Sequence, residues 1–124
     1  MPWEYTIDVD ARLVYSRAWG HLTDVDLLDH QHQLARDPLF DRDLSQLVDF
    51  LGVIDMAAVK TDTLMTLARQ NLWGAHSRRA FVVVQAEAFG LVRMFQVHRE
   101  AADGTDQIRL FTTREEALAW LAKR

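Results

Sequence analysis

Two carboxylates around an apolar run are the residues of this sequence best placed to do chemistry. Asp49 lies within the apolar run 47–51, and Asp55 follows it after Gly52. A carboxylate among apolar residues is costly to bury unless it is hydrogen-bonded or paired, so it is either a structural acceptor or a general base with a raised pKa. We prefer the structural role, in which Asp49 accepts hydrogen bonds from N–H groups of the following loop. No nucleophile, triad or Gly-rich phosphate loop accompanies it, so we expect no enzymatic activity.

The segment around these acids predicts a binding loop. The run 47–51 is typical of a buried strand, and a helical pattern starts near Asp62, so we expect the backbone to reverse after Phe50. Ligands and partners of open α/β sheets bind at such carboxyl ends of strands. The residues predicted to bind a partner or ligand there are Asp49, Phe50, Gly52, Asp55, Met56, Lys60 and Thr61.

The histidines have a spacing that could hold a metal ion. Asp26 with His30, and Asp29 with His32, are each placed so that one helix face could supply two ligands. No third ligand is evident, and His30 and His32 point in nearly opposite directions on a helix. We therefore interpret them as solvated helix surface and expect no metal and no cofactor.

A basic cluster precedes the most apolar strand of the sequence. It consists of Arg69, Arg78 and Arg79, with Lys60 near it. Guanidinium groups bind phosphates and carboxylates, so the cluster could hold an anion. We favour a solvated cluster that balances the acidic part of the chain.

The aromatic residues allow an apolar pocket. Trp3, Trp19, Trp73 and Trp120 lie at the ends of expected elements, where aromatic rings usually close the edge of a core. They could also line a ligand-binding cavity together with Phe50, Met56 and Met65, near the loop that follows the third strand.

Composition excludes several classes of protein. The chain has 124 residues, which suits one domain over residues 1–124. The absence of cysteine excludes disulfides and thiolate metal sites. A net charge of −4 argues against nucleic-acid binding. Since neither a signal peptide nor a membrane span is recognised, we expect a soluble, cytoplasmic protein.

Periodicity and turn residues predict the element order β-β-α-β-α-β-α-β-α. Such a hairpin followed by βα repeats predicts an α/β fold with a mixed five-stranded sheet and four helices. The first helix is capped by Thr23 and Asp26 and should bury Val25, Leu28 and Ala35. The strands are expected at 3–9, 13–19, 44–50, 80–84 and 107–111, and the helices at 23–37, 62–73, 87–99 and from a Thr112–Glu115 capping box onward.

The helix expected at 87–99 has more apolar surface than one core face needs. Gly90, Met94 and Val97 widen its apolar stripe sideways, so that the apolar arc exceeds the roughly 100° that a covering helix requires. Excess apolar surface beside a core face is typical of an interface. These residues predict a homodimer contact, with coverage by neighbouring loops as the alternative.

Five segments of the chain carry a family resemblance. They are YTID (5–8), RLVYSRAWG (12–20), LVDFLGV (47–53), FGLVRMF (89–95) and TTREEALAWL (112–121). With these segments the chain resembles the STAS-like superfamily, the fold of anti-sigma-factor antagonists and sulfate-transporter tails. It looks most like the small stand-alone bacterial members, which are largely uncharacterised. The resemblance implies a regulatory α/β domain over nearly the whole chain.

One position departs from the family pattern. In anti-sigma-factor antagonists, an Asp-Ser pair after the third strand carries the phosphorylated serine, whereas this chain has Asp55 and Met56 there. A thioether cannot accept a phosphoryl group. Thr61 and Thr63 are nearby hydroxyls that could be phosphorylated near a helix N-terminus, although helix capping is the role that we favour.

Residues and resemblance together predict a non-catalytic, regulatory module. We expect it to bind a protein partner, or a second copy of itself, through the loop between Phe50 and Asp62. The alternative is a protein that binds a small apolar or amphipathic, lipid-like ligand in a pocket between sheet and helices.

Overall fold

The computed structural model describes residues 2–70, 72–102 and 106–123, and it confirms the predicted order of elements. Over these residues the fold is a mixed five-stranded sheet with four helices, as expected from the sequence. The strands are β1 (Trp3–Asp8), β2 (Leu13–Thr23), β3 (Ser45–Ala58), β4 (Arg78–Val82) and β5 (Gln107–Phe111). The helices are α1 (Asp24–Arg36), α2 (Thr61–Arg69), α3 (Ala86–Ala101) and α4 (Arg114–Ala122).

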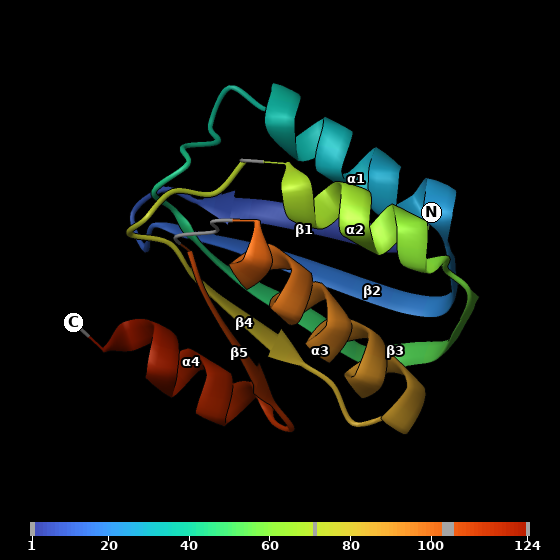
Figure 1. Cartoon of the computed structure of the whole chain (residues 1–124). Helices are drawn as coiled ribbons and strands as arrows, with labels where there is room; N and C mark the ends of the chain where they lie inside the picture. Colours follow the sequence, from blue (N-terminus) through green and yellow to red (C-terminus); the bar gives the residue numbers. More distant parts are fainter. Residues whose placement is uncertain (1, 71, 103–105, 124) are drawn as a thin grey trace.

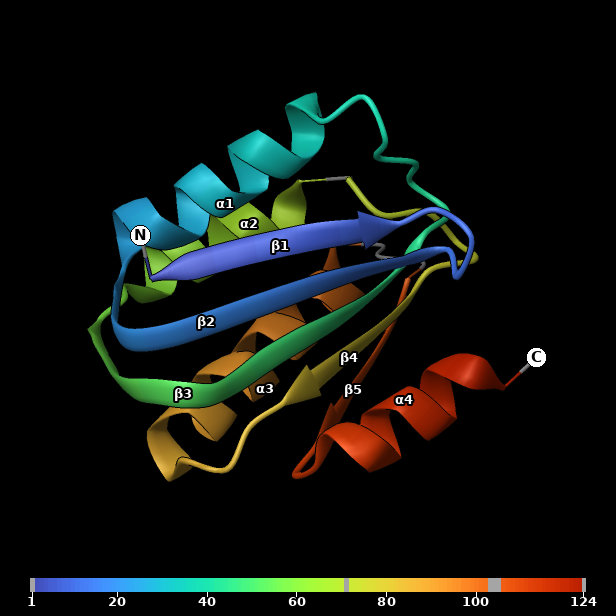
Figure 2. The same cartoon turned by 180° about the vertical axis from the view of Figure 1, so that it is seen from behind.

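The sheet has the strand order β1-β2-β3-β4-β5, with β1 antiparallel to β2 and the other neighbours parallel. The two faces of this sheet are covered unequally. Helices α1, α2 and α3 lie on one face (Figure 1). Helix α4 lies alone on the other face, beside β4 and β5, so that β1 and β2 have no helix over them there (Figure 2).

Successive side chains of β3 contact the helices on opposite faces of the sheet. Val48 and Phe50 pack in the core beneath α1, α2 and α3, whereas Leu47 packs with Ala117 and Trp120 of α4 on the opposite face. Successive side chains of a strand point to opposite faces. Asp49 therefore faces away from the three-helix layer, next to Tyr15 of β2.

The predicted reversal after Phe50 is wrong, because β3 continues to Ala58 and β2 continues to Thr23. The two extensions pair with each other, and their register shifts near Trp19 and Gly52. Gly52 permits this close approach, since a Cβ there would lie 3.1 Å from Cβ of Trp19. Glycine within a strand commonly marks such an irregularity rather than a turn.

The N-terminal caps of α1 and α4 differ in how well the sequence predicted them. The capping box of α1 is confirmed, with Thr23 and Asp26 satisfying each other's backbone N–H groups. The box predicted for α4 is one residue too early, because Thr113 accepts from the N–H of Glu116 and donates to its carboxylate. Neighbouring threonines offer the same cap chemistry, so the sequence alone did not distinguish them.

The buried face of α1 also differs from the prediction. Its buried residues are Leu27, His30 and Leu34, whereas Val25 is 63% exposed. The helix is rotated so that His30 packs against rings of β1, with Trp3 at a centroid separation of 4.2 Å and Tyr5 at 5.7 Å. No helix within the described residues is long and apolar enough to cross a membrane.

Candidate functional site

The residues predicted to form one binding loop belong to two faces of the sheet. Phe50 and Met56 are buried in the core under α1, α2 and α3. Asp49 is buried on the opposite face, and Gly52 pairs with Trp19 inside the sheet. The loop prediction therefore fails as a single site, although two of its residues line the cavity described below.

Asp49 is held by donors from three directions. Its Oδ2 accepts from Nε of Arg114 at 2.6 Å and from the hydroxyl of Tyr15 at 3.1 Å, and its Oδ1 accepts from the N–H of Leu51 at 2.9 Å. Burial alone would raise the pKa of Asp49, but these donors outweigh it and hold the pKa below the ordinary value. A carboxylate stabilised in its charged form fits the structural role predicted for Asp49.

Three other residues of the predicted loop, Asp55, Lys60 and Thr61, lie near the junction of β3 and α2. Asp55 pairs with His21 of β2 and accepts from the N–H of Ala57, and these contacts lower the pKa of Asp55, the N–H most strongly. The backbone N–H of Lys60 donates to Asp24 of α1 at 2.8 Å. Thr61 is the exposed first residue of α2, so the connection between strand and helix is short.

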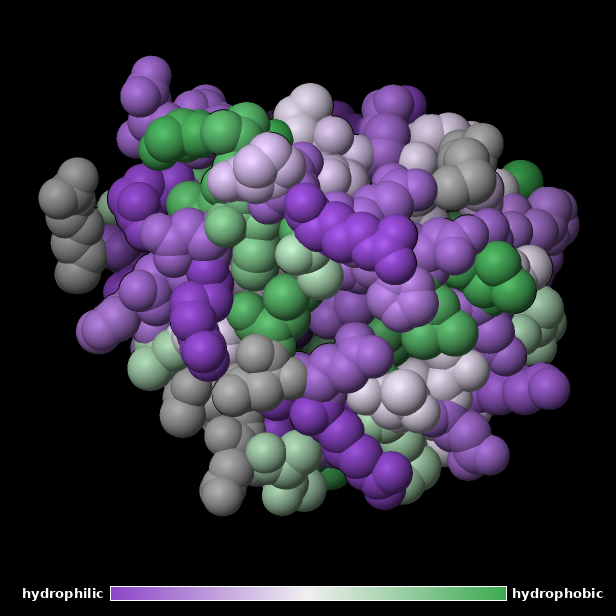
Figure 3. Space-filling view, turned by 90° about the horizontal axis from the view of Figure 1, so that it is seen from above, coloured by the Kyte–Doolittle hydropathy of each residue, from purple (hydrophilic) through white to green (hydrophobic). Residues whose placement is uncertain are grey.

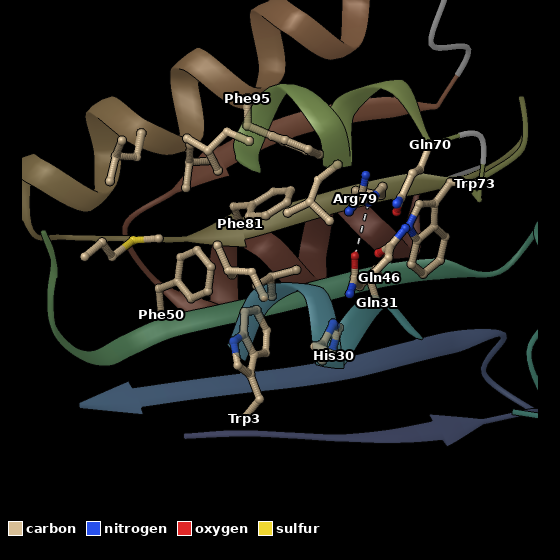
Figure 4. A pocket seen from close by; sticks show the side chains of 17 residues that line it. Trp3, His30, Gln31, Gln46, Phe50, Gln70, Trp73, Arg79, Phe81 and Phe95 are labelled. Carbon is tan, nitrogen blue, oxygen red and sulfur yellow. Dashed lines mark hydrogen bonds between the residues drawn. The ribbon is translucent and has the colours of Figure 1, made fainter. Parts of the chain in front are cut away.

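A cavity of about 70 Å³ lies between the sheet and the three-helix layer. One water needs about 10–15 Å³ of such space, so the cavity has room for several. Side chains of the strands form its floor, and α1, α2 and α3 form its walls (Figure 4). The residues lining it are Trp3, Leu27, His30, Gln31, Gln46, Val48, Phe50, Met56, Leu64, Leu67, Gln70, Trp73, Arg79, Phe81, Leu91, Val92 and Phe95.

Some of the residues that line the cavity are partly exposed. Gln31 of α1, Leu67 of α2 and Gln70, which follows α2, are partly exposed, whereas Phe50 and Phe81 below them are buried. From above the molecule, hydrophobic residues are visible between hydrophilic ones (Figure 3). The lining of the cavity therefore includes both partly exposed and buried side chains.

The two ends of the cavity differ in chemistry. Phe50 and Phe81 lie toward one end, whereas Gln46, Gln70 and Arg79 gather toward the other (Figure 4). Such a lining, apolar with a few converging polar groups, is typical of small-molecule sites.

A chain of buried polar groups holds the polar end in place. His30 lies 3.0 Å from the hydroxyl of Ser16, and Nε2 of Gln46 donates to the same hydroxyl at 3.0 Å. Oε1 of Gln46 in turn accepts from Nε of Arg79 at 3.1 Å. The guanidinium of Arg79 forms an ion pair with Asp106 at 3.3 Å. Each group orients the next, so the end of the cavity is pre-formed.

Burial shifts the titration of two members of this chain. It lowers the pKa of His30 to about 4, with the positive charge of Arg79 adding to the effect, so His30 is neutral at pH 7. Burial also lowers the pKa of Arg79, to about 10, and Asp106 opposes that change. Arg79 therefore keeps its charge. The predictions of solvated positions for His30 and Arg79 are wrong, because both side chains are buried.

The aromatic pocket predicted from the sequence is partly confirmed. Trp3 and Trp73 line the cavity together with Phe50 and Met56. Trp120 instead packs with α4 on the other face of the sheet, and neither Trp19 nor Met65 is among the lining residues. The pocket predicted from the sequence did not include Gln46 or Arg79, although Arg79 was named in the basic cluster. The two-residue period of a strand could have indicated where they point. Gln46 lies two residues before Val48, and Arg79 lies two residues before Phe81, and both Val48 and Phe81 face the core.

The predicted interface on α3 is partly exposed. Gly90 is exposed and Val97 is 56% exposed, whereas Met94 packs partly against the core. Phe89, on the same helix, is 42% exposed. The apolar surface of α3 is therefore not covered by loops within the described parts of the chain.

Comparison with known proteins adds no family. The sequence matches no protein-family model, and a search of curated proteins found no match. Within residues 2–70, 72–102 and 106–123, no group of three or more histidine and acidic side chains is arranged to hold a metal ion.

Proposed function

We propose that this protein binds a small amphipathic molecule in the cavity between its sheet and helices α1, α2 and α3. The observation that carries the proposal is the two-ended lining, with aromatic and aliphatic side chains at one end and Arg79, Gln46 and Gln70 at the other. An apolar tail would lie against Phe50 and Phe81, and a polar head would lie near Arg79.

The cavity is unusual for a core of this size. Protein interiors are packed almost as densely as organic crystals, and voids larger than a water are few. Here the void is next to a buried arginine and a buried glutamine, which an empty apolar packing defect would not need. A bound ligand explains both the space and the polar residues.

We propose a non-catalytic role for the site. Asp49, the general-base candidate from the sequence, lies on the opposite face and is paired with Arg114. His30 and Gln46 hold one another through Ser16. His30, Ser16 and Gln46 are therefore engaged in mutual positioning, which suits binding.

The experiment uses two matched variants of α2. Leu67 lines the cavity, and Met65 is also half-buried on the same helix but does not line it. Calorimetric titration with octanol should give one site in the wild type, loss of binding in Leu67→Trp and unchanged binding in Met65→Trp. Absence of binding to every alcohol from hexanol to decanol, with no molecule retained in native mass spectrometry of fresh protein, would contradict the proposal.

A regulatory protein-binding role is our second candidate, and the exposed apolar residues of α3 favour it. Phe89 and Val97 could contact a second copy of the chain or another protein. The motifs that resemble the STAS-like superfamily, together with the α/β fold class, support assignment to that fold and hence a cytoplasmic regulatory domain. The two candidates are compatible, since Phe89 and Val97 do not line the cavity.

A further inference from the structure

Arg79, at the polar end of the cavity, belongs to a buried cluster with more positive than negative charge. Arg79 and Arg99 both form ion pairs with Asp106, at 3.3 Å and 3.0 Å. All three side chains are at least nine-tenths buried, with exposed fractions of 8%, 4% and 0%. Among the residues that the structure describes, no other acid forms an ion pair with either arginine. Within this cluster of described residues two cations thus share one anion, which leaves the cluster with one excess positive charge.

Aromatic rings stabilise this charge without neutralising it. The guanidinium of Arg79 lies 4.9 Å from the ring centroid of Trp73, 5.5 Å from that of Phe81 and 5.4 Å from that of Phe95. Such contacts attract the cation more strongly when they are removed from water. A buried charge nevertheless costs several kcal/mol unless it is paired. The excess charge of the cluster is therefore unfavourable unless a further negative charge binds near it.

The same end of the cavity has an unused donor. Nε1 of Trp73 is buried and has no hydrogen-bond partner, and Trp73 is only 2% exposed. Trp73 lies beside Gln70 and Arg79 at the polar end (Figure 4). Buried donors normally find an acceptor. Excess positive charge together with an unpartnered N–H calls for an acceptor that carries negative charge.

We propose that the ligand is an anion, a short-chain or medium-chain carboxylate whose head group binds Arg79 and Trp73 while its tail lies against Phe50 and Phe81. This inference rests on the proposed function, because it names the chemical class of the ligand that the cavity accepts. The planar guanidinium suits the two oxygens of a carboxylate. One negative charge balances the two arginines and Asp106, whereas a cationic ligand would add to the imbalance.

The test compares ligands that differ only in their head group. Octanoate, octanol and octylamine are titrated into the full chain at pH 7 by calorimetry, and hexanoate and decanoate extend the series in length. Since a hydrogen bond to a charged group is worth about 1.5–3 kcal/mol, octanoate should bind roughly tenfold to a hundredfold more tightly than octanol. Octylamine should bind more weakly than octanol.

A substitution of Arg79 tests whether the charged cluster causes the tighter binding of octanoate. Arg79→Gln removes the excess charge and leaves Arg99 paired with Asp106, so octanoate should then bind no more tightly than octanol. Arg79→Lys keeps the charge and should keep most of the preference. The comparison of head groups in the unmodified chain needs neither variant to fold.

The outcomes separate this inference from the proposed function. Equal binding of octanoate and octanol would overturn the anionic ligand and leave a cavity for neutral amphiphiles. A preference for octanoate that survives Arg79→Gln would also overturn it, because the charge would then lie elsewhere. Absence of binding to every member of the series would overturn the proposed function itself.

Discussion

Arg114, the first residue of α4, donates from Nε to the buried carboxylate of Asp49 on β3 at a distance of 2.6 Å. The two residues are 65 positions apart, and their ion pair fastens the helix that covers the second face to the central strand. Asp49 is 1% exposed, whereas Arg114 is half exposed. The carboxylate is therefore a structural acceptor, as the sequence predicted, on a face that the cavity does not reach.

The substitution Asp49→Asn tests this structural role. It removes the charge that three donors stabilise, and it should lower the free energy of unfolding by about 2 kcal/mol. The loss is smaller than for a fully buried ion pair, because the half-exposed Arg114 regains contact with water. Urea unfolding measures the change. Asp10→Asn, at an exposed position, is the control, and an equal effect of both substitutions would argue against a special role for Asp49.

The buried imidazole of His30 predicts how stability depends on pH. Its pKa is about 4 in the folded chain against an ordinary value of 6.5, so between these values the unfolded chain binds the extra proton. The contribution of His30 to the free energy of unfolding is therefore complete above pH 6.5. It declines by about 3 kcal/mol as the pH falls toward 4.

Two histidine variants isolate that contribution. His30→Gln should flatten the decline between pH 6.5 and 4, since the amide does not titrate and can still reach the hydroxyl of Ser16. His32→Gln, at an exposed site on the same helix, should leave the decline as it is in the wild type. Denaturant melts at several pH values measure both. A full-sized decline in His30→Gln would show that another group causes it.

Two glycines predict opposite effects of the same substitution. A Cβ at Gly52 would lie 3.1 Å from Cβ of Trp19 and 3.3 Å from the carbonyl oxygen of Ala18, whereas a Cβ at Gly90 would meet nothing within 4 Å. Gly52→Ala should therefore destabilise the chain by roughly 1–2 kcal/mol through crowding. Gly90→Ala should stabilise it by about 1 kcal/mol, because alanine favours the helix. Thermal unfolding tests the pair, and effects of equal sign would contradict it.

The exposed apolar residues of α3 predict self-association. Val97→Glu should shift a dimer toward monomer in sedimentation velocity, because a charge on that face opposes burial against a second copy. Val25→Glu changes a similarly exposed valine on α1 and should have no such effect. A wild-type chain that stays monomeric at every accessible concentration would remove α3 from consideration as a dimer contact.

Local signals in the sequence predicted the parts of the fold that depend on near neighbours. The alternation of Trp3, Tyr5 and Ile7 is the alternation of burial in β1, and the Thr23–Asp26 capping box begins α1. Both need only residues within one element. The order of elements follows from the same kind of information, since each change of period marks a new element.

The features that the sequence did not reveal depend on distant partners. β3 continues past Phe50 because the extension of β2 pairs with it across Gly52, which no local pattern records. Arg79 is buried because Gln46 and Asp106, at separations of 33 and 27 residues, satisfy it. Charged and polar residues are assigned to the surface by default. The sequence pattern therefore predicts solvated positions for Arg79 and His30, which are both buried.

The four tryptophans allow the most direct test of the central claim, that a small amphipathic molecule occupies the cavity. Trp3 and Trp73 line it, and Trp19 and Trp120 do not, so their indole N–H signals in a nitrogen–proton correlation spectrum report on binding inside and outside the cavity at once. Titration with octanoate should shift the signals of Trp3 and Trp73, the latter most, and leave those of Trp19 and Trp120 in place. Shifts confined to Trp19 and Trp120, or none at saturating ligand, would contradict the account.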